Sequence, residues 1–171
     1  KDHPEQLRTW VNCYLGETFE TAGDVLDHNS IMERRETYEH EVPKGGLLLT
    51  LSCDVQKDSL QTLVMAHGVK DEKWLISADI IWGDPSEEYV WDELKKIILR
   101  PWSLHNGKEI PITASFIDSG YLTPQVYKFC KLMQPHRVFA TKGVGGQGRP
   151  AVGRPSRSNS QKLPVIPIGV N

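Results

Sequence analysis

The stretch LLLTLSCDV, residues 47–55, decides the fold, because it is an apolar run that closes on a charged residue, Asp54. Two more strand-like runs follow at residues 60–69 and 74–82, with only short polar segments between them. Connections this short favour antiparallel neighbours. The sequence therefore predicts three consecutive antiparallel strands at the start of the core.

Helices and strands alternate in the second half of the chain. Asp84-Pro85 is typical of an N-cap followed by the first helical residue, and it predicts a helix of about four turns that ends before Pro101. Residues 111–118 and 137–141 predict strands, with a second helix between them over residues 123–133. Each helix is long enough to cross between parallel strands. By analogy of element order, we expect a mixed α/β sheet of the ribonuclease-H-like type with flanking helices.

Three flanking segments lack the strand alternation. Residues 4–15 have apolar side chains at helical spacing, and residues 17–46 are polar and aperiodic, as in a connector. Residues 143–162 are rich in Gly, Pro, Ser and Arg, which predicts a mobile basic loop. Residues 163–170 predict a last strand, interrupted by proline and therefore at an edge of the sheet.

Length and composition indicate one globular core. With 171 residues, 39% of them hydrophobic, we expect a helix and connector over residues 1–45 and one domain over residues 46–171. The first residue is Lys1 and the last is Asn171, directly after a strand-like run, so we expect an excised fragment whose domain is truncated at its C-terminal end.

Cysteine usage and hydropathy argue against several classes of protein. Cys13, Cys53 and Cys130 lie far apart, which argues against a zinc site or a disulfide framework. No apolar stretch approaches the roughly 20 residues that cross a bilayer. We expect a soluble intracellular protein without a membrane partner.

Charge is distributed unevenly along the chain. The formal net charge is −2. No Asp or Glu follows Asp118, so residues 119–171 carry +8 and residues 1–118 carry −10. This asymmetry indicates a polyanion-binding surface beside an acidic site, although runs of charge are as often simply solvated faces. The eight basic residues are Lys128, Lys131, Arg137, Lys142, Arg149, Arg154, Arg157 and Lys162.

Asp54 and Asp118 each end an apolar, strand-like run. If these two strands lie parallel and adjacent, both carboxylates emerge at the carboxyl edge of the sheet, where open α/β sheets bind ligands. Their mutual repulsion would be relieved by Mg²⁺ or Mn²⁺, which prefer oxygen ligands. The alternative for either residue alone is a role in a turn or cap.

Other polar residues are weaker candidates. Asp84 or Glu88 could direct a carboxylate toward the metal from the first helix, but Asp84 is better interpreted as an N-cap. Gln56 and Asp58 are interpreted as shaping the hairpin after Asp54. Ser119 and Gly120 are interpreted as turning the chain, and Lys142 as either a phosphate contact or a solvated lysine.

Four groups of residues together resemble the lambda-type (GpA-like) bacteriophage terminase large subunits. They are Leu49–Asp58 (LTLSCDVQKD), Phe116–Tyr121 (FIDSGY) with Val126–Cys130 (VYKFC), Arg137–Gly143 (RVFATKG), and the upstream residues 7–18 with Arg35, Tyr38 and Val42-Pro43. The upstream group is similar to the family's junction between ATPase and nuclease. The resemblance thus covers nearly the whole chain.

The resemblance implies the C-terminal, ribonuclease-H-like nuclease of a DNA-packaging motor, which cuts concatemeric double-stranded viral DNA. It implies that Asp54 and Asp118 are the first two metal-binding acids, that a third lies beyond Asn171, and that the complete site holds two Mg²⁺ or Mn²⁺ ions. No GxxxxGK[ST] motif occurs, so ATP belongs only to the absent motor domain. The implied partners are viral DNA, the terminase small subunit and the portal or procapsid, in the host cytoplasm.

Two functional hypotheses follow. The first is a metal-dependent endonuclease with Asp54 and Asp118 as its catalytic residues. The second is a DNA-clamping or capsid-docking module, catalytically incomplete by itself, in which basic residues carry the affinity. In both, DNA phosphates are expected to contact Lys142, Arg149, Arg154 and Arg157. An ATPase is a distant third, because no phosphate-binding loop supports it.

Overall fold

The computed structural model describes residues 28–33, 35–157 and 162–170. The chain divides into two compact units, residues 1–37 and 38–171. In the first unit the described element is the helix α2 (His28–Glu33), and the helix predicted over residues 4–15 lies outside the described residues. No described helix is long and apolar enough to span a membrane. The division into a connector over residues 1–45 and a domain from residue 46 stays a prediction.

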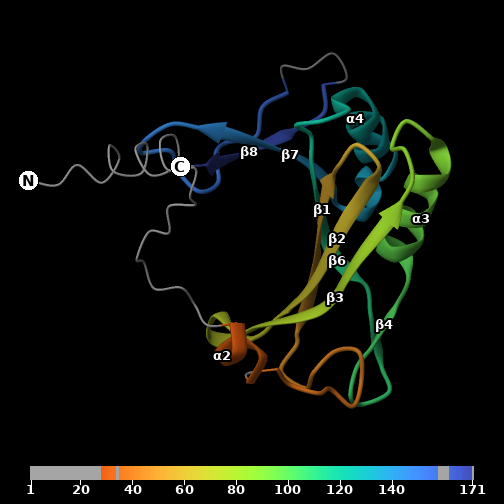
Figure 1. Cartoon of the computed structure of the whole chain (residues 1–171), viewed down its shortest axis with the longest axis vertical. Helices are drawn as coiled ribbons and strands as arrows, with labels where there is room; N and C mark the ends of the chain where they lie inside the picture. The colour runs from red at the N-terminus through yellow and green to blue at the C-terminus, as the bar shows by residue number, and fades with distance from the viewer. Residues whose placement is uncertain (1–27, 34, 158–161, 171) are drawn as a thin grey trace, which may run out of the picture. The chain divides into compact units, whose positions relative to one another are not determined.

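The second unit is built on a six-stranded mixed sheet with the order β3-β2-β1-β6-β7-β8 (Figure 1). The first three strands form the predicted antiparallel meander, and β1, β6, β7 and β8 pair in parallel. The prediction of a mixed, ribonuclease-H-like α/β sheet is confirmed. The strands are β1 (Leu48–Val55), β2 (Ser59–His67), β3 (Lys73–Trp82), β6 (Ile112–Asp118), β7 (Val138–Gly145) and β8 (Val165–Val170).

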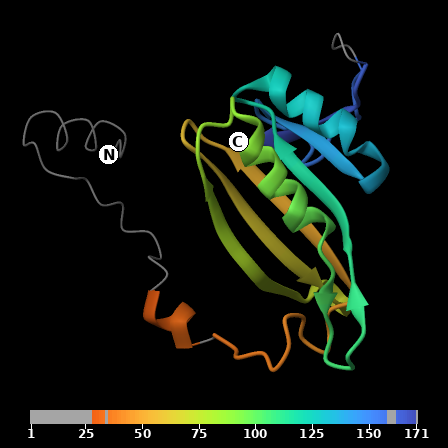
Figure 2. The same cartoon turned by 90° about the vertical axis from the view of Figure 1, so that its right-hand side faces the viewer.

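Both long helices of this unit, α3 (Glu88–Leu99) and α4 (Thr123–Leu132), cover the same face of the sheet (Figure 2). The core lies between them and the strands, where the rings of Trp91 and Phe129 are 5.1 Å apart. Within the described part of the unit, no helix covers the opposite face (Figures 1 and 2). Within the described part of this unit, the sheet therefore has one face covered by helices and one face without a helix, which we call the open face.

Strand β1 shows why the acids stand on the open face. Successive side chains of a strand point to opposite faces. Leu49, Leu51 and Cys53 are buried toward the helices, whereas Ser52 and Asp54 are exposed. The same alternation that builds the core thus turns Asp54 away from it.

Short elements absent from the predictions connect the main ones. A one-turn 3-10 helix, η2 (Val69–Asp71), replaces the end of the second predicted strand, and η3 (Gln134–His136) follows α4. A small hairpin pairs β4 (Trp102–Ser103) with β5 (Glu109–Ile110) between α3 and β6.

The start of α3 differs from the prediction. Its N-cap is Glu87, not Asp84, and Pro85 precedes the helix. Asp84 instead accepts a hydrogen bond from the backbone N–H of Ser86 at 2.8 Å, which lowers the pKa of its carboxyl. The buried indole N–H of Trp91 donates to the carbonyl oxygen of Pro85 at 2.8 Å. This hydrogen bond holds the carbonyl group of Pro85 in a turn that precedes the helix.

The basic segment also differs from the mobile loop that we predicted. Strand β7 continues through Gly143 to Gly145, and the chain then returns along the outer edge of β8. Val152 pairs with Ile168 and Ser156 with Val165, both antiparallel. An edge strand has unpaired backbone groups, and this return segment satisfies several of them. The prediction that residues 163–170 form the last strand of the sheet is confirmed.

We expect Leu51→Ala to lower the free energy of unfolding by about 2–5 kcal/mol, because it leaves a cavity in the core beneath β1. Leu51 is fully buried. Urea unfolding followed by circular dichroism measures the change. Leu75→Ala is the control, because Leu75 is 51% exposed on β3 and its truncation should cost under about 0.5 kcal/mol. Equal losses in both variants would contradict this account of the core.

Candidate functional site

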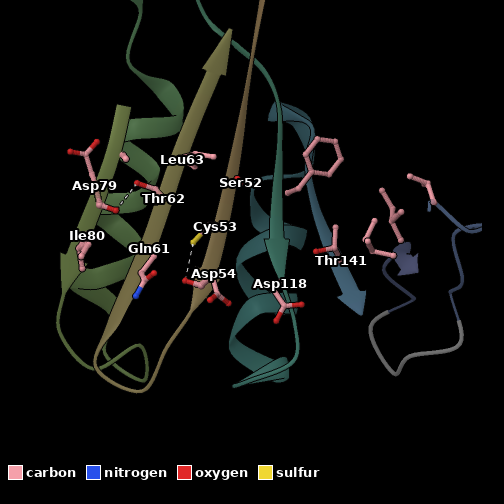
Figure 3. Close-up of a pocket in the computed structure, with 15 residues that line it drawn as sticks. Ser52, Cys53, Asp54, Gln61, Thr62, Leu63, Asp79, Ile80, Asp118 and Thr141 are labelled. Carbon is pink, nitrogen blue, oxygen red and sulfur yellow. Dashed lines mark hydrogen bonds between the residues drawn. The ribbon is translucent and has the colours of Figure 1, made fainter. Parts of the chain in front are cut away.

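Asp54 and Asp118 lie side by side at the carboxyl ends of β1 and β6. The two strands are parallel, and Cys53 pairs with Ile117, so the next residue of each strand is an aspartate. Figure 3 shows both carboxylates at the same end of these neighbouring strands. The expected parallel, adjacent arrangement of the two strands is thus observed, and the structure brings together two acids that are far apart in the sequence.

The two acids belong to a row of side chains that crosses the open face. Asp54 pairs with Gln61 on β2, and Asp118 pairs with Thr141 on β7. All four line a broad hollow of about 940 Å³ (Figure 3). Its other walls are mainly apolar and include Leu63, Ile80, Phe116, Val152, Ile166 and Ile168. The hollow therefore places Asp54 and Asp118 together at one end of a mainly apolar surface, with a third carboxylate, Asp79, on β3 (Figure 3).

Each carboxylate accepts a hydrogen bond from a donor two residues further along the chain. The side-chain amide of Gln56 donates to Oδ2 of Asp54. The backbone N–H of Gly120 donates to Oδ2 of Asp118 at 3.1 Å. Among the described residues, the other carboxylate oxygen, Oδ1, accepts no hydrogen bond in either aspartate. One oxygen of each acid is held and one remains available to a ligand.

The turn after Asp118 is anchored by Ser119, whose side chain is fully buried. Its hydroxyl and its backbone N–H both donate to the carbonyl oxygen of Thr141, at 2.7 and 2.8 Å. The hydroxyl of Thr123 then donates to the carbonyl oxygen of Ser119 at 2.7 Å. Ser119 therefore turns the chain, as interpreted from the sequence, and also ties the end of β6 to β7 and α4.

Cys53 precedes Asp54 on β1, and its side chain is buried. Burial raises the pKa of its thiol well above the usual range, and the charges of Asp54 and Asp118 add to the effect. Burial also raises the pKa of Cys130, to about 12. Metal ions bind the thiolate form, and burial disfavours that form in both cysteines.

The donor set of the site is two carboxylates. Across residues 28–33, 35–157 and 162–170, no group of three or more His, Cys, Asp or Glu side chains is placed to hold a metal ion. Mg²⁺ is commonly held by one or two carboxylates, with waters and substrate phosphates completing its octahedral shell. The oxygen atoms of Asp54 and Asp118 fit such an ion.

The weaker acidic candidates are not brought to this site. Asp84 closes the turn before α3, and Glu88 lines a different hollow between α3 and α4 with Trp91 and Phe129. Neither residue lines the hollow of Asp54 and Asp118.

The basic residues lie around the β7–β8 edge. Arg149 and Arg154 line a hollow of about 230 Å³ that shares no lining residue with the acidic hollow. Lys142 pairs with Pro167, which lines the same small hollow, and the alternation of β7 directs it away from the face that Thr141 occupies. Arg149, Arg154, Arg157 and Lys142 are all exposed.

Sequence reasoning did not identify Gln61 and Thr141 as neighbours of the acids, and it gave Gln56 and Gly120 no role toward them. Gln61 and Thr141 flank the acids through the pairing of β1 with β2 and of β6 with β7. The register of those pairings is not visible in the strand pattern. The spacing of two residues from each acid to Gln56 and Gly120 is visible in the sequence, but the direction of their donors is not.

Comparison with known proteins gives two kinds of match. A family model described as "Terminase large subunit gpA, endonuclease domain" matches residues 1–171. The terminase large subunit of Escherichia phage lambda is 31% identical over 166 residues, covering 96% of this chain and 26% of that protein. The corresponding subunit of Enterobacteria phage P21 is 29% identical over 170 residues, covering 98% and 26%. No solved structure matches.

The family model spans the whole chain, and the chain spans 26% of the length of each relative. The two acids of the site lie within both the family match and the described sheet. The chain therefore belongs to the family of terminase large-subunit gpA endonuclease domains.

Proposed function

We propose that this chain is the metal-dependent nuclease part of a viral DNA-packaging terminase and that Asp54 and Asp118 are its catalytic carboxylates. The observation that carries the proposal is their adjacency at the carboxyl edge of β1 and β6, on a face that the described helices leave open. An open edge admits a polymer as long as DNA, whereas an enclosed pocket does not.

The chemistry proposed is hydrolysis of a phosphodiester bond. Mg²⁺ or Mn²⁺, two ions in the complete site, would activate a water molecule and stabilise the leaving oxygen. The part played by this chain is to hold the carboxylates of Asp54 and Asp118 in orientation, with Gln56 and Gly120 as their hydrogen-bond donors.

The proposed substrate is concatemeric double-stranded viral DNA in the host cytoplasm. Phosphate contacts are assigned to Lys142, Arg149, Arg154 and Arg157, which are exposed along the β7–β8 edge. Such contacts are independent of sequence and weaken as salt rises. The terminase small subunit and the portal or procapsid are the proposed protein partners of the whole terminase.

A second candidate function is a DNA-clamping or capsid-docking module. It is favoured by one observation: the hollow of Arg149 and Arg154 is separate from the hollow of Asp54 and Asp118. Binding through the arginines would then be independent of the acids, so the two functions are separable by substitution.

We expect Asp54→Asn and Asp118→Asn each to reduce Mn²⁺-dependent nicking of plasmid DNA by at least about 100-fold, because removal of a ligand should cost no less than removal of a residue that supports one. Nicking is measured by gel electrophoresis with and without EDTA. Asp79→Asn is the matched control, because Asp79 lines the same hollow on β3, away from the acid pair (Figure 3). Nicking that continues undiminished in EDTA would exclude the metal-dependent mechanism.

We expect the triple substitution of Arg149, Arg154 and Arg157 by Ala to weaken DNA binding and to reduce the slope of log K against log salt by about 0.9 for each lost phosphate contact. Fluorescence anisotropy at several salt concentrations measures both quantities. The matched control replaces Lys44, Lys73 and Lys108 by Ala. These three exposed lysines lie away from the carboxyl edge of the sheet, so their loss should leave the slope of log K against log salt nearly unchanged. An equal effect of the two triple variants would show that only overall charge matters.

A further inference from the structure

We propose that Gln56 is a positioning residue: its side-chain amide orients the carboxylate of Asp54 for a divalent cation, and the backbone N–H of Gly120 does the same for Asp118. This inference rests on the proposed metal-dependent function and adds to it the residues that set the geometry of the acids. Gln56 touches Asp54 and acts through it, so it is distinct from the catalytic pair.

The backbone of Gln56 is held in the tight connection between β1 and β2. Its backbone N–H donates to the carbonyl oxygen of Ser59 at 2.9 Å, which closes the tight connection between β1 and β2. Its backbone therefore shapes the hairpin, as interpreted from the sequence. Its side chain turns back and donates to Oδ2 of Asp54. The hairpin thus sets the backbone position from which the Gln56 side chain reaches one oxygen of the acid.

Gly120 provides the corresponding donor on the neighbouring strand. Its N–H lies 3.1 Å from Oδ2 of Asp118. A Cβ atom at this position would lie 2.9 Å from the same oxygen, closer than such atoms approach each other in proteins. Glycine at position 120 therefore lets the backbone approach the carboxylate closely without displacing it.

The two donors have the same physical effect on the pair of acids. Each N–H stabilises the charged carboxylate and restrains its rotation. In both aspartates, Oδ1 accepts no hydrogen bond from the described residues. Metal-binding carboxylates are commonly supported by hydrogen bonds of this kind. A neutral amide supports the acid without bringing a positive charge that would compete with the cation.

Gln61 provides an internal comparison. It is the same residue type, it pairs with Asp54 across β1 and β2, and it lines the same hollow. Within the described residues, however, the side chain that donates to Asp54 is that of Gln56. Gln61 is therefore a neighbour of Asp54 through strand pairing alone, whereas Gln56 donates a hydrogen bond to it.

The test is Mn²⁺ calorimetry on the whole chain with Gln56→Met and Gln61→Met. Methionine keeps the length of the side chain and removes the amide donor. We expect Gln56→Met to weaken Mn²⁺ binding by roughly 10- to 100-fold at unchanged stoichiometry, and Gln61→Met to leave the affinity within about 3-fold of the wild type. Stoichiometry separates the two causes of loss, because a folding defect lowers the number of sites whereas a positioning defect lowers the affinity of each.

A second pair of variants tests the same role on the other strand. Gly120→Ala should weaken Mn²⁺ binding to a similar degree, whereas Gly145→Ala, whose added Cβ has no neighbour closer than 4.0 Å, should not. Equal affinity in the wild type and Gln56→Met would overturn the positioning role while leaving the metal site intact. No Mn²⁺ binding by the wild-type chain would overturn the metal-dependent function together with the positioning role.

Discussion

The parallel pairing of β1 with β6 is the constraint on which the rest of the structure depends. A parallel ladder fixes the register of its two strands, and here it sets Cys53 beside Ile117 and thus Asp54 beside Asp118. Parallel neighbours cannot be joined by a tight turn, so the chain crosses over through α3 before it enters β6. The same requirement places α4 between β6 and β7. The pairing of β1 with β6 therefore determines where the two acids meet, and the parallel pairings together require the helices that cover the sheet.

The two faces of the sheet have opposite roles because strand side chains alternate. Toward the helices, β1 presents Leu51 and Cys53 to a continuous core; toward the open side, it presents Asp54. Two like charges at adjacent strand ends are tolerated because they remain near solvent and each accepts an N–H donor, from Gln56 or Gly120. Burial of the same pair without a cation would be far more costly. The exposure of this face thus allows the two carboxylates to lie side by side.

Local patterns predicted much of this fold. Apolar alternation located the six strands of the sheet, and their order with the two helices predicted its mixed topology. The errors occurred where a distant contact overrode a local signal. Asp84 has the sequence context of an N-cap, but the bond from Trp91 to the carbonyl of Pro85 places the turn ahead of the helix. Residues 143–162 have the composition of a loop, but β8 has an edge whose backbone groups need partners, and Val152 and Ser156 pair with it.

The sequence by itself determined which residues are candidates for the chemistry: an aspartate at the end of each of two apolar runs, and a following segment that contains bases and no acids. These are properties of residue type and spacing, which the chain carries before it folds. The tertiary structure alone decided that Gln61 and Thr141 flank the acids, that Gln56 and Gly120 turn their donors toward them, and that Arg149 and Arg154 line a separate hollow. Strand register and side-chain direction arise from long-range pairing, and no local pattern encodes them.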